Sequence, residues 1–307
     1  MVETLDTVNH SLATRVFAVV AVPLAATVLC VVFATLLFAQ WRARRRPYQL
    51  VWAVGLSFYA IASGAESVGQ VAGWSDPVYR IWYFFGAVCV AAWLGLGEVY
   101  LFRTSAFGEL VALAVFAGAI PAMIRGGRLL GAQAEGPAQM AVAVGLIVIA
   151  AAGVLALVAW EKPRALGHVA LVMLAFGMLV AGYHVVTAPV DLTEILDPAT
   201  GIPRGQGFPE TVRLLTPPFN LAGALAMIFG ALYSAWNYWR RRESLQRVLS
   251  NSLIAVGAMA PSLTSTLNRF GITGLFHWGE LLGVLLIFAG FLANNDVITR
   301  RLARRAA

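Results

Sequence analysis

The sequence contains little charge, few cysteines and almost no lysine. Only 12% of its 307 residues are charged while 60% are hydrophobic, and a soluble domain of this composition would expose large apolar patches to water. The two cysteines, Cys30 and Cys89, lie far apart in apolar segments, which excludes a disulfide framework and a CxxC metal site. The single lysine, Lys162, lies in a predicted loop, so no helix offers a lysine for a Schiff base.

Catalytic and nucleotide-binding motifs are absent as well. The sequence has no P-loop, no HExxH, no GxSxG and no dinucleotide-binding fingerprint. No soluble catalytic domain fits between its hydrophobic segments. A function other than that of an enzyme is therefore favoured.

The sequence does contain nine apolar segments, each about long enough to cross a bilayer, since roughly 30 Å of hydrocarbon requires about 20 helical residues. The expected spans are 16–40, 48–73, 78–102, 106–124, 138–160, 164–188, 213–239, 245–267 and 274–297. We therefore expect an all-α integral membrane protein, a bundle of about nine transmembrane helices that forms one polytopic domain over residues 1–307.

The basic residues predict the orientation of this bundle. Lysine and arginine concentrate in cytoplasmic loops, and fifteen of the 22 basic residues fall on one set of alternate loops against seven on the other. This pattern predicts an outside N-terminus and a cytoplasmic C-terminus in the cytoplasmic (inner) membrane. The net charge of +7 is then explained by arginines that face anionic lipid headgroups. The expected partners are the lipid bilayer and other membrane subunits, and no nucleic acid is expected.

Two segments have a character of their own. The longest loop, 189–212, is rich in proline and glycine, which predicts an extracytoplasmic cap made of turns. The span 245–267 is unusually polar, so we expect it inside the bundle, where helices exchange hydrogen bonds. Its sequence leaves open whether it crosses the membrane completely.

The sequence also contains a weak internal repeat. A shift of 198 residues aligns Trp41-Arg42 with Trp239-Arg240, and Gly73 with Gly271, without a gap. It would make the first three and the last three spans parallel repeats, as in many transporter folds. Because most positions inside the paired spans differ, the sequence alone favours chance similarity.

Ionisable side chains inside a membrane indicate a functional site. Glu66 shares one helical face with Tyr59 and Gln70, and His277 and Glu280 share a face of the last span. Polar residues on four spans lie at about the same outer level. The candidate ligand-binding residues are Glu66, Gln70, His184, Asn220, His277 and Glu280.

Several functions are compatible with these residues. We favour the binding and transport of a small molecule or lipid through a polar cavity in the outer half, with Glu66 as ligand or proton acceptor. His184 and His277, the only paired candidates for a metal, could instead hold haem b in a quinone-linked redox subunit, or zinc for hydrolysis. A non-catalytic sensory or structural subunit is the third alternative. Glu98, near Arg103, is expected to reach the inner surface or to pair locally.

Overall fold

The computed structural model describes residues 2–102, 163–198, 200–269 and 275–293. In these ranges the elements are helices joined by turns, with one isolated β-bridge between Leu196 and Pro203. The expected spans 106–124 and 138–160 lie outside the described residues.

Six long helices are α1 (Val2–Arg44), α2 (Pro47–Ala72), α7 (Pro163–Thr187), α9 (Thr216–Arg240), α10 (Leu245–Arg269) and α11 (Phe276–Ala293). The third expected span consists of α3 (Asp76–Tyr83), a π-helical turn η1 (Phe84–Cys89) and α4 (Val90–Phe102). Three short elements, η2 (Leu192–Glu194), η3 (Gly205–Gly207) and α8 (Glu210–Arg213), precede α9.

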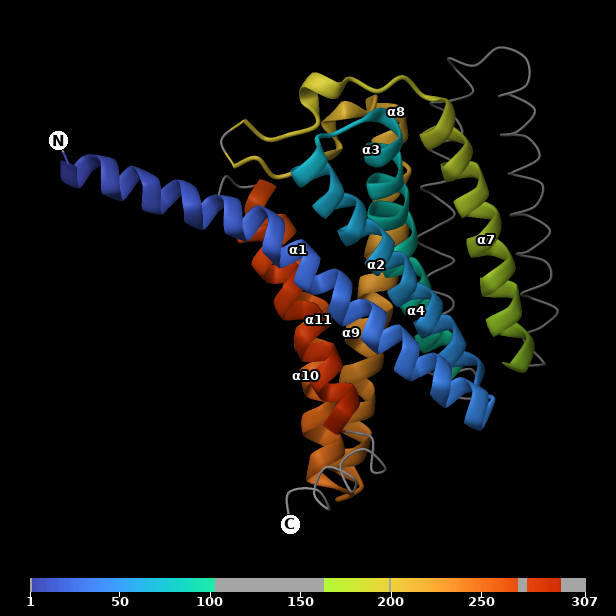
Figure 1. Ribbon diagram of the computed structural model, residues 1–307. Coiled ribbons are helices and arrows are strands. Elements are labelled where there is room, and N and C mark those ends of the chain that lie inside the picture. The colour runs from blue at the N-terminus through green and yellow to red at the C-terminus, as the bar shows by residue number, and fades with distance from the viewer. Residues whose placement is uncertain (1, 103–162, 199, 270–274, 294–307) are drawn as a thin grey trace, which may run out of the picture.

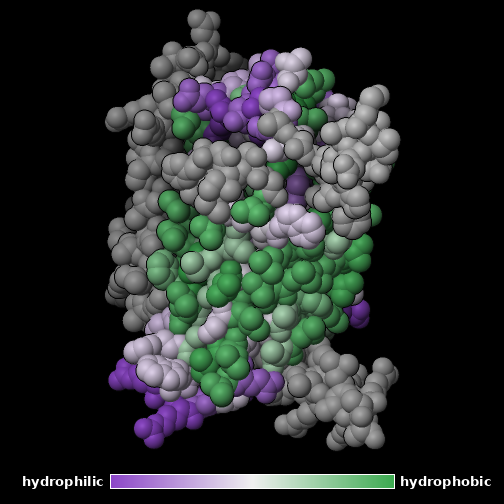
Figure 2. Space-filling model, turned by 90° about the vertical axis from the view of Figure 1, so that its left-hand side faces the viewer, coloured by the Kyte–Doolittle hydropathy of each residue, from purple (hydrophilic) through white to green (hydrophobic). Residues whose placement is uncertain are grey.

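Six helical segments in the described part of the chain are long and apolar enough to cross a membrane. They are Val19–Arg44, Pro47–Ala72, Asp76–Phe102, Gly167–Thr187, Glu210–Arg240 and Phe276–Ala293. On the face shown in Figure 2, a hydrophobic belt crosses the middle of the molecule, and hydrophilic residues gather above and below it. Such a belt between two polar ends is the surface of a multi-pass membrane protein.

Two of the expected spans differ in detail from the helices observed. The first helix begins at Val2 and not at residue 16. The third span is not one regular α-helix, because its middle widens into the π-helical turn η1. Gly86 lies in this turn, and glycine has the weakest helix preference after proline, so the regular hydrogen-bond pattern is easily lost there.

Six helices form a closed ring. Going round it, α1 packs against α2, α2 against α4, α4 against α9, α9 against α10, α10 against α11, and α11 against α1. Helix α7 lies outside this ring, against α4, η1 and α3 (Figure 1).

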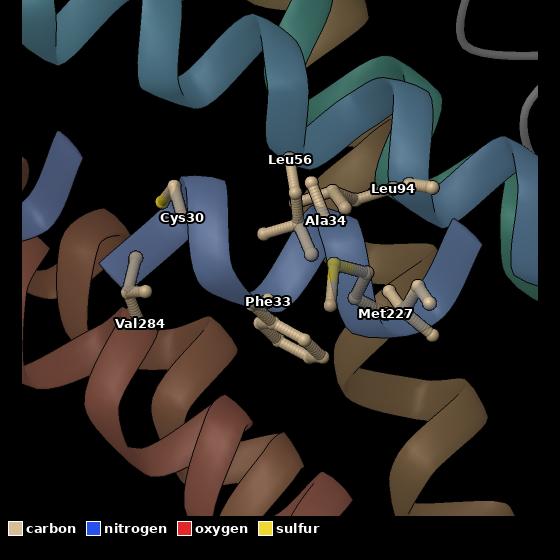
Figure 3. Packing of buried hydrophobic residues seen from close by; sticks show 9 residues of the cluster. Cys30, Phe33, Ala34, Leu56, Leu94, Met227 and Val284 are labelled. Atoms are coloured by element: carbon tan, nitrogen blue, oxygen red, sulfur yellow. The ribbon is translucent and has the colours of Figure 1, made fainter. Parts of the chain in front are cut away.

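The middle of the ring is filled by apolar side chains. Five of the six helices contribute a buried residue, and Figure 3 shows how Phe33 and Ala34 of α1 lie among Leu56, Leu94 and Met227. The Phe33 ring also contacts two rings of α11, with centroid distances of 5.0 Å to Phe288 and 4.8 Å to Phe291. The ring is therefore closed at mid-depth by packed side chains.

The polar helix α10 lies in the ring with one face against its neighbours. The Ser250 hydroxyl is fully buried and donates to the carbonyl of Gly290 in α11. The opposite face exposes Leu249, Val256 and Leu263. The expected hydrogen bonding between helices is thus present, but the helix is not enclosed by the bundle.

The two ends of the ring differ in charge. The arginines between Arg42 and Arg46 lie in the last turn of α1 and directly after it, and Arg240 to Arg242 lie at the end of α9 and directly after it. Both groups are at the end where α7 begins, which we name the arginine end (Figure 1). The segment 188–213, with η2, η3 and α8, lies at the opposite end, which we name the loop end (Figure 1). The two arginine clusters in the described part of the chain therefore lie at one end of the ring.

The segment 188–213 is an ordered cap of turns over the loop end. Its own residues Ile195 and Phe208 are buried, and the Tyr79 hydroxyl of α3 donates to the carbonyl of Arg204 at 2.8 Å. Asp191 starts η2, and hydrogen bonds from the hydroxyl and the backbone N–H of Thr193 hold the pKa of its carboxyl below the usual value. The proline- and glycine-rich loop is thus held to the helices by specific contacts.

The ring consists of two units of three helices. The first unit comprises α1, α2 and the α3–α4 span, and the second comprises α9, α10 and α11. Helix α2 begins at Pro47 and α10 begins 198 residues later at Leu245, while their ends are Ala72 and Arg269. Within each unit the second helix packs against the first and the third, and the first helix of each unit packs against the third helix of the other.

The same position of the second helix donates a hydrogen bond in both units, although the two acceptors lie 196 and not 198 residues apart. The Trp52 indole donates to the carbonyl of Leu94 at 3.1 Å, and Ser250, the residue 198 positions later, donates to the carbonyl of Gly290. In both cases the second helix of a unit is tied to the backbone of its third helix. The reciprocal packing and this shared bond favour a structural repeat over the chance similarity that the sequence suggested.

Candidate functional site

One face of α2 carries a ladder of polar residues that points into the ring. Ser63 donates to the carbonyl of Tyr59 at 2.8 Å, and Ser67 donates to the carbonyl of Ser63 at 2.9 Å. The Thr27 hydroxyl of α1 donates to the Ser63 hydroxyl at 2.9 Å. These short side chains satisfy their own hydrogen bonds, so the long side chain of Glu66 is free to reach across the ring.

Glu66 meets His277 of α11 inside the ring. Nδ1 of His277 lies 3.0 Å from Oε1 of Glu66, and each side chain is only 3% exposed. The other carboxylate oxygen, Oε2, accepts a hydrogen bond from the Trp82 indole of α3 at 3.1 Å. Residues from three helices, α2, α3 and α11, therefore meet at one point.

Glu280 completes the cluster one helical turn along α11. The Glu280 carboxylate, the Glu66 carboxylate and the His277 imidazole each offer one ligand atom, and these three atoms lie within 4.8 Å of one another. The Tyr59 hydroxyl donates to the backbone carbonyl of Glu280 at 3.2 Å, which fixes α11 against α2. We name Glu66, His277 and Glu280 the carboxylate–histidine cluster.

The contact between Glu66 and His277 leaves polar atoms unsatisfied. Although Nδ1 and Oε1 are close, they do not have the geometry of a hydrogen bond, and neither atom has another hydrogen-bond partner in the described structure. Nε2 of His277 is buried without a partner as well. A buried polar group without a partner destabilises a protein by about 1–3 kcal/mol. The cluster thus holds three such atoms side by side.

The cluster contains more negative than positive groups. It combines two carboxylates with one imidazole, and among the described residues no arginine lies within ion-pair distance of Glu66 or Glu280. Charges interact more strongly away from water, where the effective dielectric constant is low. The arrangement therefore favours a positively charged ligand.

The other three candidates lie elsewhere. Gln70 donates from Nε2 to the carbonyl of Gly201 at 3.0 Å and so ties α2 to the cap. Asn220 is half-buried in the first turns of α9. His184 lies near the end of α7, where its ring contacts that of Tyr183. Helix α7 lies on the opposite side of the bundle from α11, with α2 and α4 between them (Figure 1).

This placement bears on the haem and zinc hypotheses. Both hypotheses require His184 and His277 at one metal, because a haem iron accepts two axial imidazoles and the proposed zinc site used both histidines. The structure brings His277 to two carboxylates and keeps His184 on a helix outside the ring. The described residues therefore give no support to a metal site that pairs the two histidines.

Glu98 also differs from the expectation. Its side chain is buried, only 3% exposed, and lies against Gly230 of α9. It is too buried to reach a surface, and it forms no ion pair among the described residues, which do not include Arg103. The missing Cβ of Gly230 provides the space for this carboxyl group, which a sequence that shows only the depth of Glu98 does not reveal.

Sequence reasoning missed one residue of the site. Trp82 fits a belt of aromatic residues at the membrane boundary, yet its indole N–H turns inward to Glu66. A buried tryptophan usually finds an acceptor for this N–H. In the sequence, Trp82 follows the polar face of α2 after only a short turn, and this closeness could have indicated that it contacts Glu66.

Comparisons of the chain with protein-family models, with curated proteins and with solved structures give no significant match.

Proposed function

We propose that this chain is a multi-pass protein of the cytoplasmic membrane that binds and transports a small cation at the carboxylate–histidine cluster. The observation that carries the proposal is the buried contact of Glu66 with His277, with the Glu280 carboxylate beside it. Ionisable groups are rare at membrane depth and there mark ion and substrate pathways. Their excess of negative groups supports a cation as the ligand.

The position of the cluster supports transport more than a purely structural role. The cluster joins α2 of the first unit to α11 of the second, and transporters with internal repeats bind their substrates between the repeats. A movement of one unit against the other would change the access to this site. In the proposed orientation the arginine end faces the cytoplasm and the loop end faces outward, because arginine-rich loops stay inside.

The proposal is tested by measuring currents from liposomes that contain the full chain. Concentration jumps of choline, putrescine, arginine, Mn²⁺ and Zn²⁺ are applied on a solid-supported membrane. We expect a transient current for at least one of these cations and its loss in Glu66→Gln, because the amide cannot supply the negative charge. Glu98→Gln is the matched control, since it removes another buried carboxyl of the same bundle and leaves the cluster intact.

Two outcomes would contradict transport of a cation at this site. One is the absence of a current for every cation of the panel. The other is a current of equal size in the wild type and in Glu66→Gln, provided that both proteins reconstitute in equal amounts. A current lost in Glu98→Gln but kept in Glu66→Gln would assign the site to the other carboxyl.

A further inference from the structure

The donor atoms of the cluster are those that a transition metal prefers. An imidazole nitrogen with carboxylate oxygens is a common ligand set for Zn²⁺ and related divalent ions. Ca²⁺ and Mg²⁺ instead prefer oxygen ligands alone and take six or more of them. The presence of His277 beside Glu66 and Glu280 therefore favours a transition-metal ion over Ca²⁺ or Mg²⁺.

Distances inside the cluster indicate the size of the ligand. Atoms that bind a tetrahedral zinc ion at about 2.0–2.2 Å lie roughly 3.4 Å apart, whereas atoms hydrogen-bonded to one ammonium group at about 2.8 Å lie roughly 4.6 Å apart. Nδ1 of His277 and Oε1 of Glu66 are 3.0 Å apart, and all three ligand atoms are within 4.8 Å of one another. The shorter spacing fits a bare metal ion better than an organic ammonium ion.

The unsatisfied atoms point to the same ligand. Nδ1 of His277 and Oε1 of Glu66, which lie 3.0 Å apart without hydrogen-bond geometry, are arranged as two ligands of one ion would be. Neither nitrogen of His277 is engaged in a hydrogen bond, so one of them carries a free electron pair in either neutral tautomer. Coordination would satisfy this nitrogen and Oε1 of Glu66 together.

Two further residues hold the ligands in place. Trp82 donates to the second carboxylate oxygen of Glu66, which leaves Oε1 directed at His277. Tyr59 donates to the backbone of Glu280 and fixes the turn of α11 that carries two of the three ligands. Such partners orient the ligands of metal sites and contribute to metal affinity.

We propose that Glu66, His277 and Glu280 bind one divalent transition-metal ion of the Zn²⁺ class between the two units of the ring. This inference rests on the proposed function, because it names the cation that the cluster binds. The three protein ligands leave a coordination position open, as in zinc sites that exchange a bound molecule. The ion would link α2 to α11 and so join the two units.

The inference is tested by metal binding to the full chain, purified without a histidine tag and freed of metal by a chelator. Zn²⁺ binding is measured by calorimetry and elemental analysis, and Co²⁺ binding by visible absorption. We expect about one ion per chain and a Co²⁺ spectrum without thiolate charge-transfer bands, since the ligands include no cysteine. His277→Ala should weaken binding by at least about 100-fold, and Trp82→Phe by about 10-fold.

His184→Ala serves as the matched control, because it removes a histidine of the loop end that lies outside the cluster. It should leave the Zn²⁺ affinity unchanged. Failure of the wild-type chain to bind about one Zn²⁺ or Co²⁺ overturns the inference, whatever the variants do. Equal affinities of the wild type and a folded His277→Ala or Glu280→Gln variant overturn it too.

The metal site and the transport function can be contradicted independently of each other. A choline or putrescine current that depends on Glu66, together with no metal binding, would overturn the metal site and keep the proposed function. Stoichiometric metal binding without any current would keep the metal site and overturn transport.

Discussion

The second helix of the first unit and the second helix of the second unit hold equivalent places in the ring, yet their polar residues differ. Glu66 of α2 corresponds to Thr264 of α10, 198 residues later. Glu66 reaches across the ring to α11, whereas Thr264 donates to the carbonyl of Ala260 in its own helix at 3.0 Å. The same position is therefore a site residue in one unit and a packing residue in the other.

The third helices also differ, but here the second unit carries the site residues. His277 and Glu280 of α11 correspond to Tyr79 and Trp82 of α3. Tyr79 is fully buried and stacks on Phe208 of the cap, with ring centroids 5.1 Å apart. A repeat of this kind would offer two equivalent positions for a site, and the carboxylate–histidine cluster occupies one of them. The asymmetry explains why one unit supplies one ligand and the other supplies two.

The largest effect is expected at the contact between α1 and α11, which joins the units through aromatic rings. Phe33→Ala would leave a cavity among Phe288 and Phe291 and lower the free energy of unfolding by about 3 kcal/mol. Phe229→Ala is the control, because the side chain of Phe229 in α9 is 52% exposed. The free energies of unfolding of both variants are measured in mixed micelles. Equal losses of stability in Phe33→Ala and Phe229→Ala would contradict the central role of the α1–α11 contact.

The equivalent contact between α4 and α9 is built from glycines instead. A Cβ on Gly95 would lie 2.6 Å from Cα of Gly223, and a backbone atom cannot move aside. Gly95→Ala should therefore lower the free energy of unfolding by about 2 kcal/mol. At Gly64 a Cβ would meet only Thr27, with the methyl at 3.6 Å and the hydroxyl at 3.9 Å, so Gly64→Ala should be neutral or stabilising.

The same measurement in mixed micelles compares these two alanine variants. A loss of stability in both would show that glycine is needed generally in these helices. A loss in neither would show that α4 and α9 are not in close contact. The α4–α9 contact would then not depend on glycine, and would not differ in this respect from the α1–α11 contact.

The depth of each residue could be predicted from the sequence, but its neighbours could not. Counting residues along a span placed Glu66, His277, Glu280 and His184 at one outer level. Only the first three converge, because α11 is part of the ring and α7 lies outside it. Helical spacing defines the face of a single helix and does not say which helices meet.

The repeat illustrates the same limit. Helix ends, where tryptophan, arginine and glycine recur, were visible in the sequence as matches at a shift of 198 residues. The paired interiors differ because each unit packs its neighbours by other means, with Trp52 and Leu94 in one and Gly257 and Gly283 in the other. Reciprocal packing survives such changes, so the order of helix contacts supports a repeat that residue identity does not.

The smallest effect is expected for the hydrogen bond that the two units share. Trp52→Phe removes the bond to Leu94, and Ser250→Ala removes the bond to Gly290. Hydrogen bonds between membrane helices contribute on average about 0.6 kcal/mol each. If the two bonds are equivalent, each variant should lose about that amount of unfolding free energy, and the double variant about twice as much, since distant sites act independently.

Ser252→Ala separates this effect from the removal of a hydroxyl as such. Ser252 lies two residues from Ser250 on the same helix, but its hydroxyl donates to the carbonyl of Val248 in α10 itself. Because that bond joins no second helix, its loss should leave the unfolding free energy nearly unchanged. A clear loss in Ser250→Ala with none in Trp52→Phe would mean that only the second unit depends on this bond, and that the units share their packing order without sharing their energetics.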